Sequence, residues 1–280
     1  MGIDIYSARF LRSEVRRGVN LGHLLTLGHQ AVYMDDEAYR ALIMSLGISF
    51  QEKIYADDLF RGLGAQSMDV MDASTFEGAN VLHNLNEPIG RELVEKYDCV
   101  FDGGALEHVF NLPQPLKNCM EMVKVGGRFL TITPANAFCG HGFYQFSPEI
   151  FYSALSDENG YSVERLLFVY RDQWYSVRKP ADIRQRVELL TCEPTLLFVS
   201  ARRVERKPVF AKWPQQSDYA TAWNAEGKAS HSSAQEKSFK DYVVSCSPIV
   251  KKLQANWRRY KHRRKCLPSN WGWFSPVNMD

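Results

Sequence analysis

The sequence lacks the patterns that mark several well-defined classes of protein. It has six cysteines but no Cys-x-x-Cys pair, so we expect reduced thiols rather than a cysteine metal cluster or a disulfide framework. No apolar run approaches the length of a membrane span, and arginines interrupt the N-terminal region that a signal peptide would occupy. The formal net charge is only +2, which does not favour a polyanion-binding protein. These absences predict a cytoplasmic protein without a metal site.

The chain is long enough for one full α/β domain and an appendage, because it has 280 residues of which 45% are hydrophobic. A patchy apolar face predicts a helix within 1–19. Short apolar runs and segments with helical spacing alternate through 20–205 and predict the main domain. The remaining segment, 206–280, is predicted to be a C-terminal extension, and its small polar stretch at 224–237 has the composition of a linker.

The clearest supersecondary unit lies between Glu95 and Asn136. The apolar run Tyr97–Phe101 predicts a buried strand, which Asp102-Gly103-Gly104 ends abruptly. Apolar residues at helical spacing then predict a helix that ends at Gly126-Gly127, and Phe129–Thr133 predicts a second strand. Strand, helix and strand in this order imply a parallel sheet, whose ligands bind near the carboxyl ends of its strands.

The two segments YDCVFDGGALEHV and VKVGGRFLTITPAN resemble the fourth and fifth strands of class I S-adenosylmethionine-dependent methyltransferases. The resemblance covers about 20–205 and implies a Rossmann-like α/β fold, a seven-stranded and mostly parallel sheet with helices on both faces. Strands expected at Tyr161–Tyr170 and Thr195–Ala201 fit the antiparallel pair that distinguishes this sheet from dinucleotide-binding folds. The resemblance also implies an enzyme that uses S-adenosylmethionine as cofactor.

Several residues after the predicted strands are assigned to the cofactor by this resemblance. Gly28 follows the first strand, where bare backbone lets a ligand approach closely. Asp72 ends the second strand and would accept both ribose hydroxyls, although a turn or helix-capping aspartate is the alternative. Asn84 follows the third strand and would accept the adenine amino group, or form an Asx turn. Asp102 and Gly103 follow the fourth strand, where the methionine part would pass.

The loop after the first strand departs from the pattern of the resembled family. This chain has His29, Gln30 and Ala31 where the family usually has further glycines, and Thr26 where an acidic residue is common. The departure leaves open a second function, a catalytically inactive binding or scaffold protein that keeps the fold. Side chains such as His29 or Gln30 filling the crevice would argue against adenosine binding.

Two histidines are candidate catalytic residues. His141 lies between two glycines in an aromatic loop after the fifth strand, and we predict that it is the general base, with a helix-capping role as the alternative. His108 follows the fourth strand about one helical turn after Gly104, and is a second base or a support of the loop. A histidine base favours O-methylation, because a histidine can deprotonate a hydroxyl. The resemblance, together with the basic and aromatic residues between Asp172 and Glu193, favours a small polar or glycan acceptor of the kind used in polysaccharide biosynthesis.

The C-terminal extension contains a basic amphipathic pattern at 248–265, followed by two tryptophans. The segment 248–274 is therefore a candidate for binding an anionic membrane surface, which would place the protein on the inner face of the membrane. Nucleic-acid binding, docking on the protein's own surface and a homo-oligomer contact are the alternatives. The sequence lacks the tetrapeptide that reads a flipped base, so we expect no sequence-specific nucleic-acid methylation.

Overall fold

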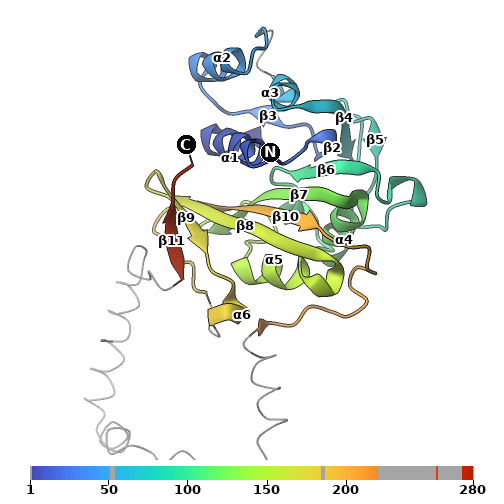
Figure 1. Ribbon diagram of the computed structural model, residues 1–280, viewed down its shortest axis with the longest axis vertical. Coiled ribbons are helices and arrows are strands. Elements are labelled where there is room, and N and C mark those ends of the chain that lie inside the picture. The colour runs from blue at the N-terminus through green and yellow to red at the C-terminus, as the bar shows by residue number, and fades with distance from the viewer. Residues whose placement is uncertain are drawn as a thin grey trace, which may run out of the picture.

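The computed structural model describes residues 2–50, 54–183, 187–217, 219, 257 and 273–279. A nine-stranded sheet forms the centre of this part of the chain, with helices on both of its faces (Figure 1). The strands of this sheet are β2 (Gly22–Leu27), β4 (Ala65–Asp72), β5 (Val81–Leu82), β6 (Tyr97–Asp102), β7 (Val123–Asn136), β8 (Tyr161–Tyr170), β9 (Gln173–Val177), β10 (Thr195–Arg203) and β11 (Phe274–Val277). A second sheet pairs β1 (Gly2–Ile3) with β3 (Ala31–Val32).

Six α-helices and three short 3-10 helices are described. The α-helices are α1 (Ile5–Arg16), α2 (Asp36–Ser45), α3 (Asp57–Gly62), α4 (Pro113–Met122), α5 (Pro148–Ala154) and α6 (Pro180–Ile183). The 3-10 helices are η1 (Arg91–Leu93), η2 (Leu106–His108) and η3 (Asp157–Asn159).

The strands of the large sheet follow the order β11-β9-β8-β10-β7-β6-β2-β4-β5. All pairs from β5 to β7 are parallel, whereas β10 is antiparallel to both β7 and β8. The expected α/β class, the largely parallel sheet and the antiparallel strand are therefore confirmed. The expected number of strands was wrong: β9 and β11 extend the sheet from seven strands to nine.

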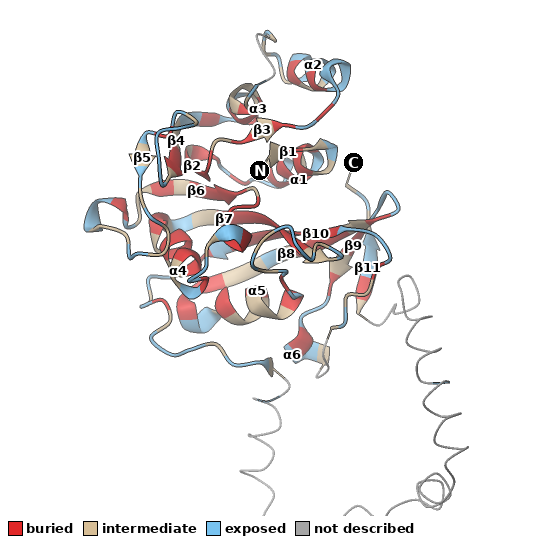
Figure 2. Cartoon of the chain, turned by 180° about the vertical axis from the view of Figure 1, so that it is seen from behind, coloured by how far each residue is buried: buried red, intermediate tan, exposed pale blue. Residues whose placement is uncertain are grey.

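Successive residues of the central strands point to opposite faces and enter two separate cores. On one face, Leu25 and Val100 pack with residues of α4 and α5. On the other, Leu24 and Phe101 pack with residues of α1, α2 and α3. Figure 2 shows the buried residues concentrated along the strands and on the inner sides of the helices. The sheet is thus covered on both sides, as a buried parallel sheet requires.

Three sequence-based boundaries differ from the structure. The predicted helix does not end at Gly126-Gly127, because α4 ends at Met122 and these glycines lie within β7. The third strand is short, since β5 contains only Val81–Leu82. The last strand, β11, returns to the edge of the sheet, where Phe274 is buried in the core.

The predicted basic helix at 248–265 lies outside the described residues, apart from Trp257. Within the described residues, no helix combines the length and the apolarity that crossing a membrane requires.

Candidate functional site

The carboxyl ends of the parallel strands bring most of the candidate cofactor residues to one edge of the sheet. Leu27, the last residue of β2, pairs with Met71 of β4 on one side and with Asp102 of β6 on the other. Gly28 follows directly, and its N–H donates to the carbonyl of Met71 at 2.8 Å. Asp72 and Gly103, the next residues along β4 and β6, therefore flank Gly28.

The loop after β2 is held by contacts within the protein. Gly28 has a φ of +68°, a conformation that favours glycine. The ring of His29 stacks on Tyr55 with 3.5 Å between centroids, and its Nε2 lies 3.0 Å from Asp57 Oδ1. Its Nδ1 lies 2.7 Å from the carbonyl of Glu77. His29 is thus fixed against its neighbours in the protein.

Gln30 fills the space between the tips of β2 and β6. Its side chain is buried and donates from Nε2 to the carbonyls of Leu27 and Gly28, at 2.7 and 3.2 Å. A Cβ atom added to Gly103 would lie 2.0 Å from Gln30 Oε1, so a larger residue at this position would require the Gln30 side chain to move. Gln30 Oε1 itself has no hydrogen-bond partner in the described part of the chain. The side-chain carboxamide of Gln30 therefore occupies the notch between the ends of these two strands.

Asp72 and Asn84 lie closer to solvent. Asp72 is partly exposed at the end of β4, and its Oδ1 accepts a hydrogen bond from the N–H of Ala73 at 2.6 Å. Asn84 is exposed, and its Oδ1 accepts from the N–H and the side-chain amide of Asn86, both at 3.1 Å. Asn84 therefore forms the Asx turn that was the alternative to an adenine contact. Although Asp72 is less exposed than Asn84, its Oδ2 accepts no hydrogen bond within the described residues and can accept one from a ligand.

The carboxylate of Asp102 faces the interior. It is fully buried, and its oxygens accept hydrogen bonds from Ala105 N–H and Thr131 Oγ1, both at 2.7 Å. Burial raises the pKa of Asp102, and these hydrogen bonds oppose the rise. Because both oxygens of Asp102 accept hydrogen bonds within the protein, this side chain stabilises the turn after β6. Gly103, the next residue, is partly exposed.

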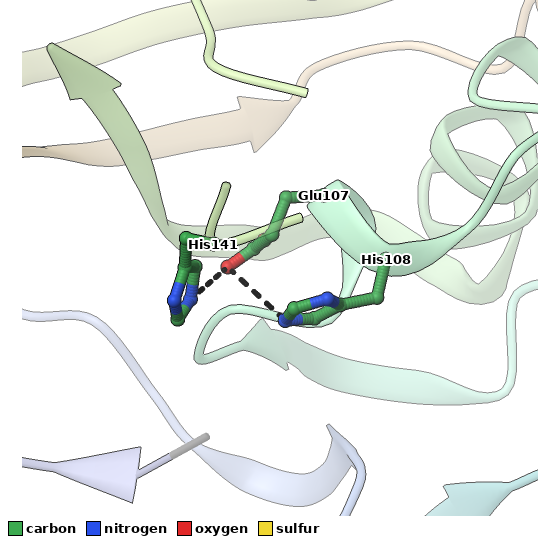
Figure 3. A group of neighbouring side chains, drawn as sticks. All are labelled: Glu107, His108 and His141. Carbon is green, nitrogen blue, oxygen red and sulfur yellow. Dashed lines mark ion pairs between the residues drawn. The ribbon is translucent and has the colours of Figure 1, made fainter. Parts of the chain in front are cut away.

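Both candidate catalytic histidines meet a buried glutamate at the same edge (Figure 3). Glu107 Oε1 lies 3.6 Å from His141 Nε2 and 4.0 Å from His108 Nε2. The two imidazole rings lie 5.2 Å apart, each with about half of its side chain exposed, whereas Glu107 is 2% exposed. Glu107 comes from η2 after β6, and His141 comes from the loop after β7. Because β6 and β7 are neighbours, the topology brings these two loops together.

The pKa values of two groups in this cluster differ from those of exposed side chains of the same type. Burial, and then repulsion from Asp102, raise the pKa of Glu107 to about 8. Burial, and then the neighbouring His141, lower the pKa of His108. Groups that titrate in the neutral range beside one another are typical of sites that transfer protons.

Close backbone contacts hold the two loops in place. The N–H of Phe143 donates to the carbonyl of Glu107 at 2.8 Å, and Tyr144 donates its hydroxyl to the carbonyl of Phe110 at 2.6 Å. A Cβ atom on Gly142 would lie 2.8 Å from the same Glu107 carbonyl, so the approach requires glycine. His141 is therefore presented by a loop with a defined position relative to η2.

A cavity of about 360 Å³ lies next to this cluster, at the start of β10 and the end of β8. Phe138 lines it and also contacts the ring of His141, with centroids 5.4 Å apart. The N-terminus of α1 contributes Tyr6, whose hydroxyl donates to Asp172 on the opposite wall. The N-terminal helix thus helps to shape this pocket.

Two residues of this edge were not among the predicted cofactor or catalytic residues. Glu107 was visible in the sequence as the neighbour of His108, after a glycine turn at a strand end, but its burial depends on the loop after β7. Gln30 was visible as a departure from the glycine pattern, and the structure shows that its side chain turns inward rather than toward solvent.

No protein-family model matches the chain, and no curated protein matches it in sequence. Among solved structures, geranyl diphosphate methyltransferase in complex with S-adenosylmethionine aligns at 10% identity with a TM-score of 0.45, covering 71% of this chain and 85% of that one. The N-methyltransferase NodS from Bradyrhizobium japonicum WM9, in complex with S-adenosylhomocysteine, aligns at 15% identity and 0.37, covering 70% and 85%. A branched-chain polyamine synthase from Thermus thermophilus aligns at 14% and 0.37, covering 75% and 59%. Likenesses at this level carry no conclusion about activity.

Proposed function

We propose that the protein is an S-adenosylmethionine-dependent methyltransferase that methylates an oxygen of a small polar or glycan acceptor. The observation that carries this proposal is the Glu107, His108 and His141 cluster beside an aromatic-walled cavity, at the carboxyl edge where open α/β sheets bind ligands. The parallel strands and the antiparallel β10, together with the sequence resemblance, supply the fold-level support.

The residues at the strand tips fit the cofactor in part. Asp72 presents a carboxylate that can accept two hydrogen bonds from a ribose, and Gly103 offers backbone without a side chain. Gln30 fills the notch between β2 and β6, so a nucleoside would lie over the strand tips rather than between them. When bound, S-adenosylmethionine supplies a methyl group on a positively charged sulfur, which is already activated for transfer.

His141 is the residue that we propose takes the proton from the acceptor hydroxyl. Its ring is half exposed, so an acceptor can reach Nε2, and Glu107 Oε1 at 3.6 Å would stabilise the imidazolium that forms. Phe138 and Tyr6 form aromatic walls of the adjoining cavity, and Arg171 and Glu193 add charged groups that can bind hydroxyls. Most of the acceleration would come from holding the acceptor in line with the methyl group.

A non-catalytic binding or scaffold role is the second candidate, and the occupied notch at Gln30 favours it. Peripheral membrane binding through 248–274 stays a prediction, because that segment lies largely outside the described residues.

Calorimetric titration of the full chain with S-adenosylhomocysteine tests the proposal. We expect binding and a raised melting temperature for the wild type, because a ligand that binds only the folded state stabilises it. Asp72→Ala should weaken binding about 10-fold or more, since hydrogen bonds to charged groups contribute about 1.5–3 kcal/mol. The matched control is Asp157→Ala, which removes an exposed aspartate of η3. No heat and no stabilisation for the wild type would favour the scaffold.

A further inference from the structure

Three potential metal ligands, one carboxylate and two imidazoles, converge on one point in the described part of the chain. Glu107 offers a carboxylate oxygen, and His108 and His141 each offer a ring nitrogen, with all three atoms within 4.8 Å of one another. Figure 3 shows Glu107 Oε1 between the two imidazole rings, which approach from separate loops.

The separations in this cluster are too long for hydrogen bonds. Glu107 Oε1 lies 3.6 Å from one imidazole nitrogen and 4.0 Å from the other, so neither donates a proton to it at a normal distance. Two ligands that each lie about 2.1 Å from one tetrahedral ion are separated by about 3.4 Å. Small movements of two half-exposed rings would therefore convert this arrangement into a coordination site.

The second observation is the absence of any hydrogen bond to the Glu107 carboxylate. Oε2 is buried without a partner in the described part of the chain, and Oε1 has only the two long contacts. Other buried carboxylates are satisfied: Asp102 accepts from Ala105 and Thr131, and Glu14 accepts from Arg165 at 2.7 Å. A buried carboxyl group without a hydrogen bond is either protonated or paired with a cation, and an ion held by the two imidazoles would supply that cation.

We propose that Glu107, His108 and His141 bind a divalent transition-metal ion of the zinc type. Two imidazoles and one carboxylate are a common ligand set for such ions, and three protein ligands leave a coordination position open for an exogenous group. The half-exposed rings leave an entry path from solvent. Gly142 and the Phe143 N–H hold the His141 loop against Glu107, so the site is largely preformed.

The role of the ion rests on the proposed function, whereas its binding does not. An acceptor hydroxyl on the open position would be acidified by the ion and would lose its proton to solvent more readily. When the ion is bound, His141 coordinates it and does not act as the general base. The aromatic cavity next to Phe138 would then hold the remainder of the acceptor.

Metal binding to the full chain, stripped with a chelator, tests the proposal directly. We expect one Zn²⁺ per chain by calorimetry, and Co²⁺ substitution should give the visible absorption bands of a tetrahedral or five-coordinate site. His108→Ala and His141→Ala should each weaken Zn²⁺ binding more than about 100-fold, because even residues that only orient a ligand contribute 10–100-fold. Both side chains are half exposed, so these variants should fold.

Two control variants locate the bound ion. His83→Ala removes an imidazole whose Nε2 contacts the carbonyl of Glu87 on a different loop, and should leave Zn²⁺ affinity unchanged. Cys139→Ser removes the exposed thiol nearest in sequence to His141, and should also leave it unchanged. Wild-type Zn²⁺ affinity in both His108→Ala and His141→Ala, or no stoichiometric binding at all, would overturn the proposal.

Titration of the same variants with S-adenosylhomocysteine separates this proposal from the proposed function. Zn²⁺ binding without nucleoside binding would leave the metal site standing and would remove the methyltransferase. Nucleoside binding without Zn²⁺ binding would support the methyltransferase and would refute the metal site.

Discussion

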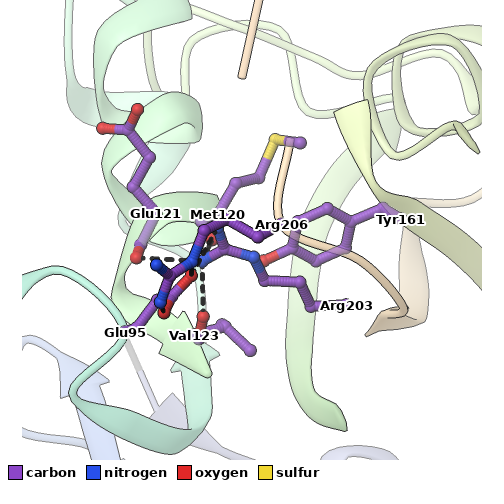
Figure 4. A network of polar contacts seen from close by, with 7 residues as sticks. All are labelled: Glu95, Met120, Glu121, Val123, Tyr161, Arg203 and Arg206. Atoms are coloured by element: carbon purple, nitrogen blue, oxygen red, sulfur yellow. Dashed lines mark hydrogen bonds and ion pairs between the residues drawn. The ribbon is translucent and has the colours of Figure 1, made fainter. Parts of the chain in front are cut away.

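Two glutamates lie at opposite ends of β6, and they differ in how the protein satisfies them. Glu95, before the strand, has 15% of its side chain exposed and pairs with Arg203 at 3.1 Å and with Arg206 (Figure 4). Glu107, after the strand, is 2% exposed and accepts no hydrogen bond within the described residues. The hydrogen bond from Arg206, and the charge of Arg203, lower the pKa of Glu95, whereas burial raises that of Glu107.

This difference in hydrogen-bond partners suggests a structural role for Glu95 and a functional role for Glu107. The guanidinium of Arg203 also donates to the carbonyls of Met120, Glu121 and Val123, so it joins the end of α4 to the start of β7. Every group there has a partner except Arg203 Nε. Buried polar groups are usually hydrogen-bonded, and Glu107 is the one carboxyl group among the unsatisfied buried side chains of the described residues, so it is the better candidate for chemistry.

The largest effect that would test this comparison is expected at Arg203. Arg203→Met should destabilise the fold by about 3–5 kcal/mol, because it leaves Glu95 with a single exposed partner and removes the hydrogen bonds from Arg203 to three backbone carbonyls. Urea unfolding, followed by circular dichroism, measures the change. Arg206→Ala is the matched control: its side chain is 76% exposed, so solvent screens its ion pair and the variant should lose much less stability than Arg203→Met. Equal losses in the two variants would refute the structural role of Arg203.

A smaller effect is expected at Gly142. Gly142→Ala should cost about 1–3 kcal/mol, because the new Cβ would lie 2.8 Å from the Glu107 carbonyl and push the loop away. It should also weaken Zn²⁺ binding by moving His141. Gly140→Ala is the control, since that glycine has a φ of +100° but open space around it. If both variants bind Zn²⁺ like the wild type, the close contact does not position His141.

Much of the fold was predictable because its strands are short apolar runs bounded by turn residues. The bounds of β8 were predicted correctly, and β2, β4 and β6 were located within two residues. The strand β9 was missed because its turn, Arg171-Asp172, adopts positive φ without a glycine or asparagine to mark it. The strand β11 was missed because Pro276 argues against a strand, and an edge position tolerates it.

The candidate site was predictable only in part, because burial and partners depend on tertiary contacts. The two histidines were selected from glycine-rich loops at strand ends, and the structure brings them together. The inward orientation of Asp102 depends on Thr131, which lies on the neighbouring strand. The filling of the notch by Gln30 depends on a bare Gly103 across the strand gap. Both pairs, Asp102 with Thr131 and Gln30 with Gly103, join residues far apart in the sequence, so the spacing of neighbouring residues does not reveal them.

The pH dependence of stability extends the comparison to a third carboxylate, Asp69 of β4. Burial opposes its ionisation, but hydrogen bonds from Lys96, Tyr97 and Asn80 lower its pKa to about 2. A lowered pKa stabilises the fold fully above the unfolded value near 3.8, and the contribution is lost as pH falls through 2. Solvent screening of this partly exposed group limits the effect to about 1 kcal/mol.

Urea midpoints at pH 6 and pH 3 measure this contribution. Asp69→Asn should lower the midpoint at pH 6 and reduce the loss on acidification, whereas Asp182→Asn on α6 should leave the loss unchanged. If Asp69→Asn lost as much stability between pH 6 and pH 3 as the wild type, other carboxylates would be responsible for that loss.

The smallest effect on stability is expected at Glu107, and it sharpens the comparison most. Glu107→Gln should change the free energy of unfolding by about 0.5 kcal/mol or less in the metal-free protein, because the Glu107 side chain accepts no hydrogen bond from another described residue and its raised pKa leaves it largely neutral below about pH 8. Glu95→Gln should cost about 1.5–3 kcal/mol, since its charged hydrogen bonds to two arginines are weakened. Chelator-treated protein, unfolded in urea, gives both values. If Glu107→Gln were as costly as Glu95→Gln, the two carboxylates would serve the fold alike, and the case for a functional centre after β6 would fall.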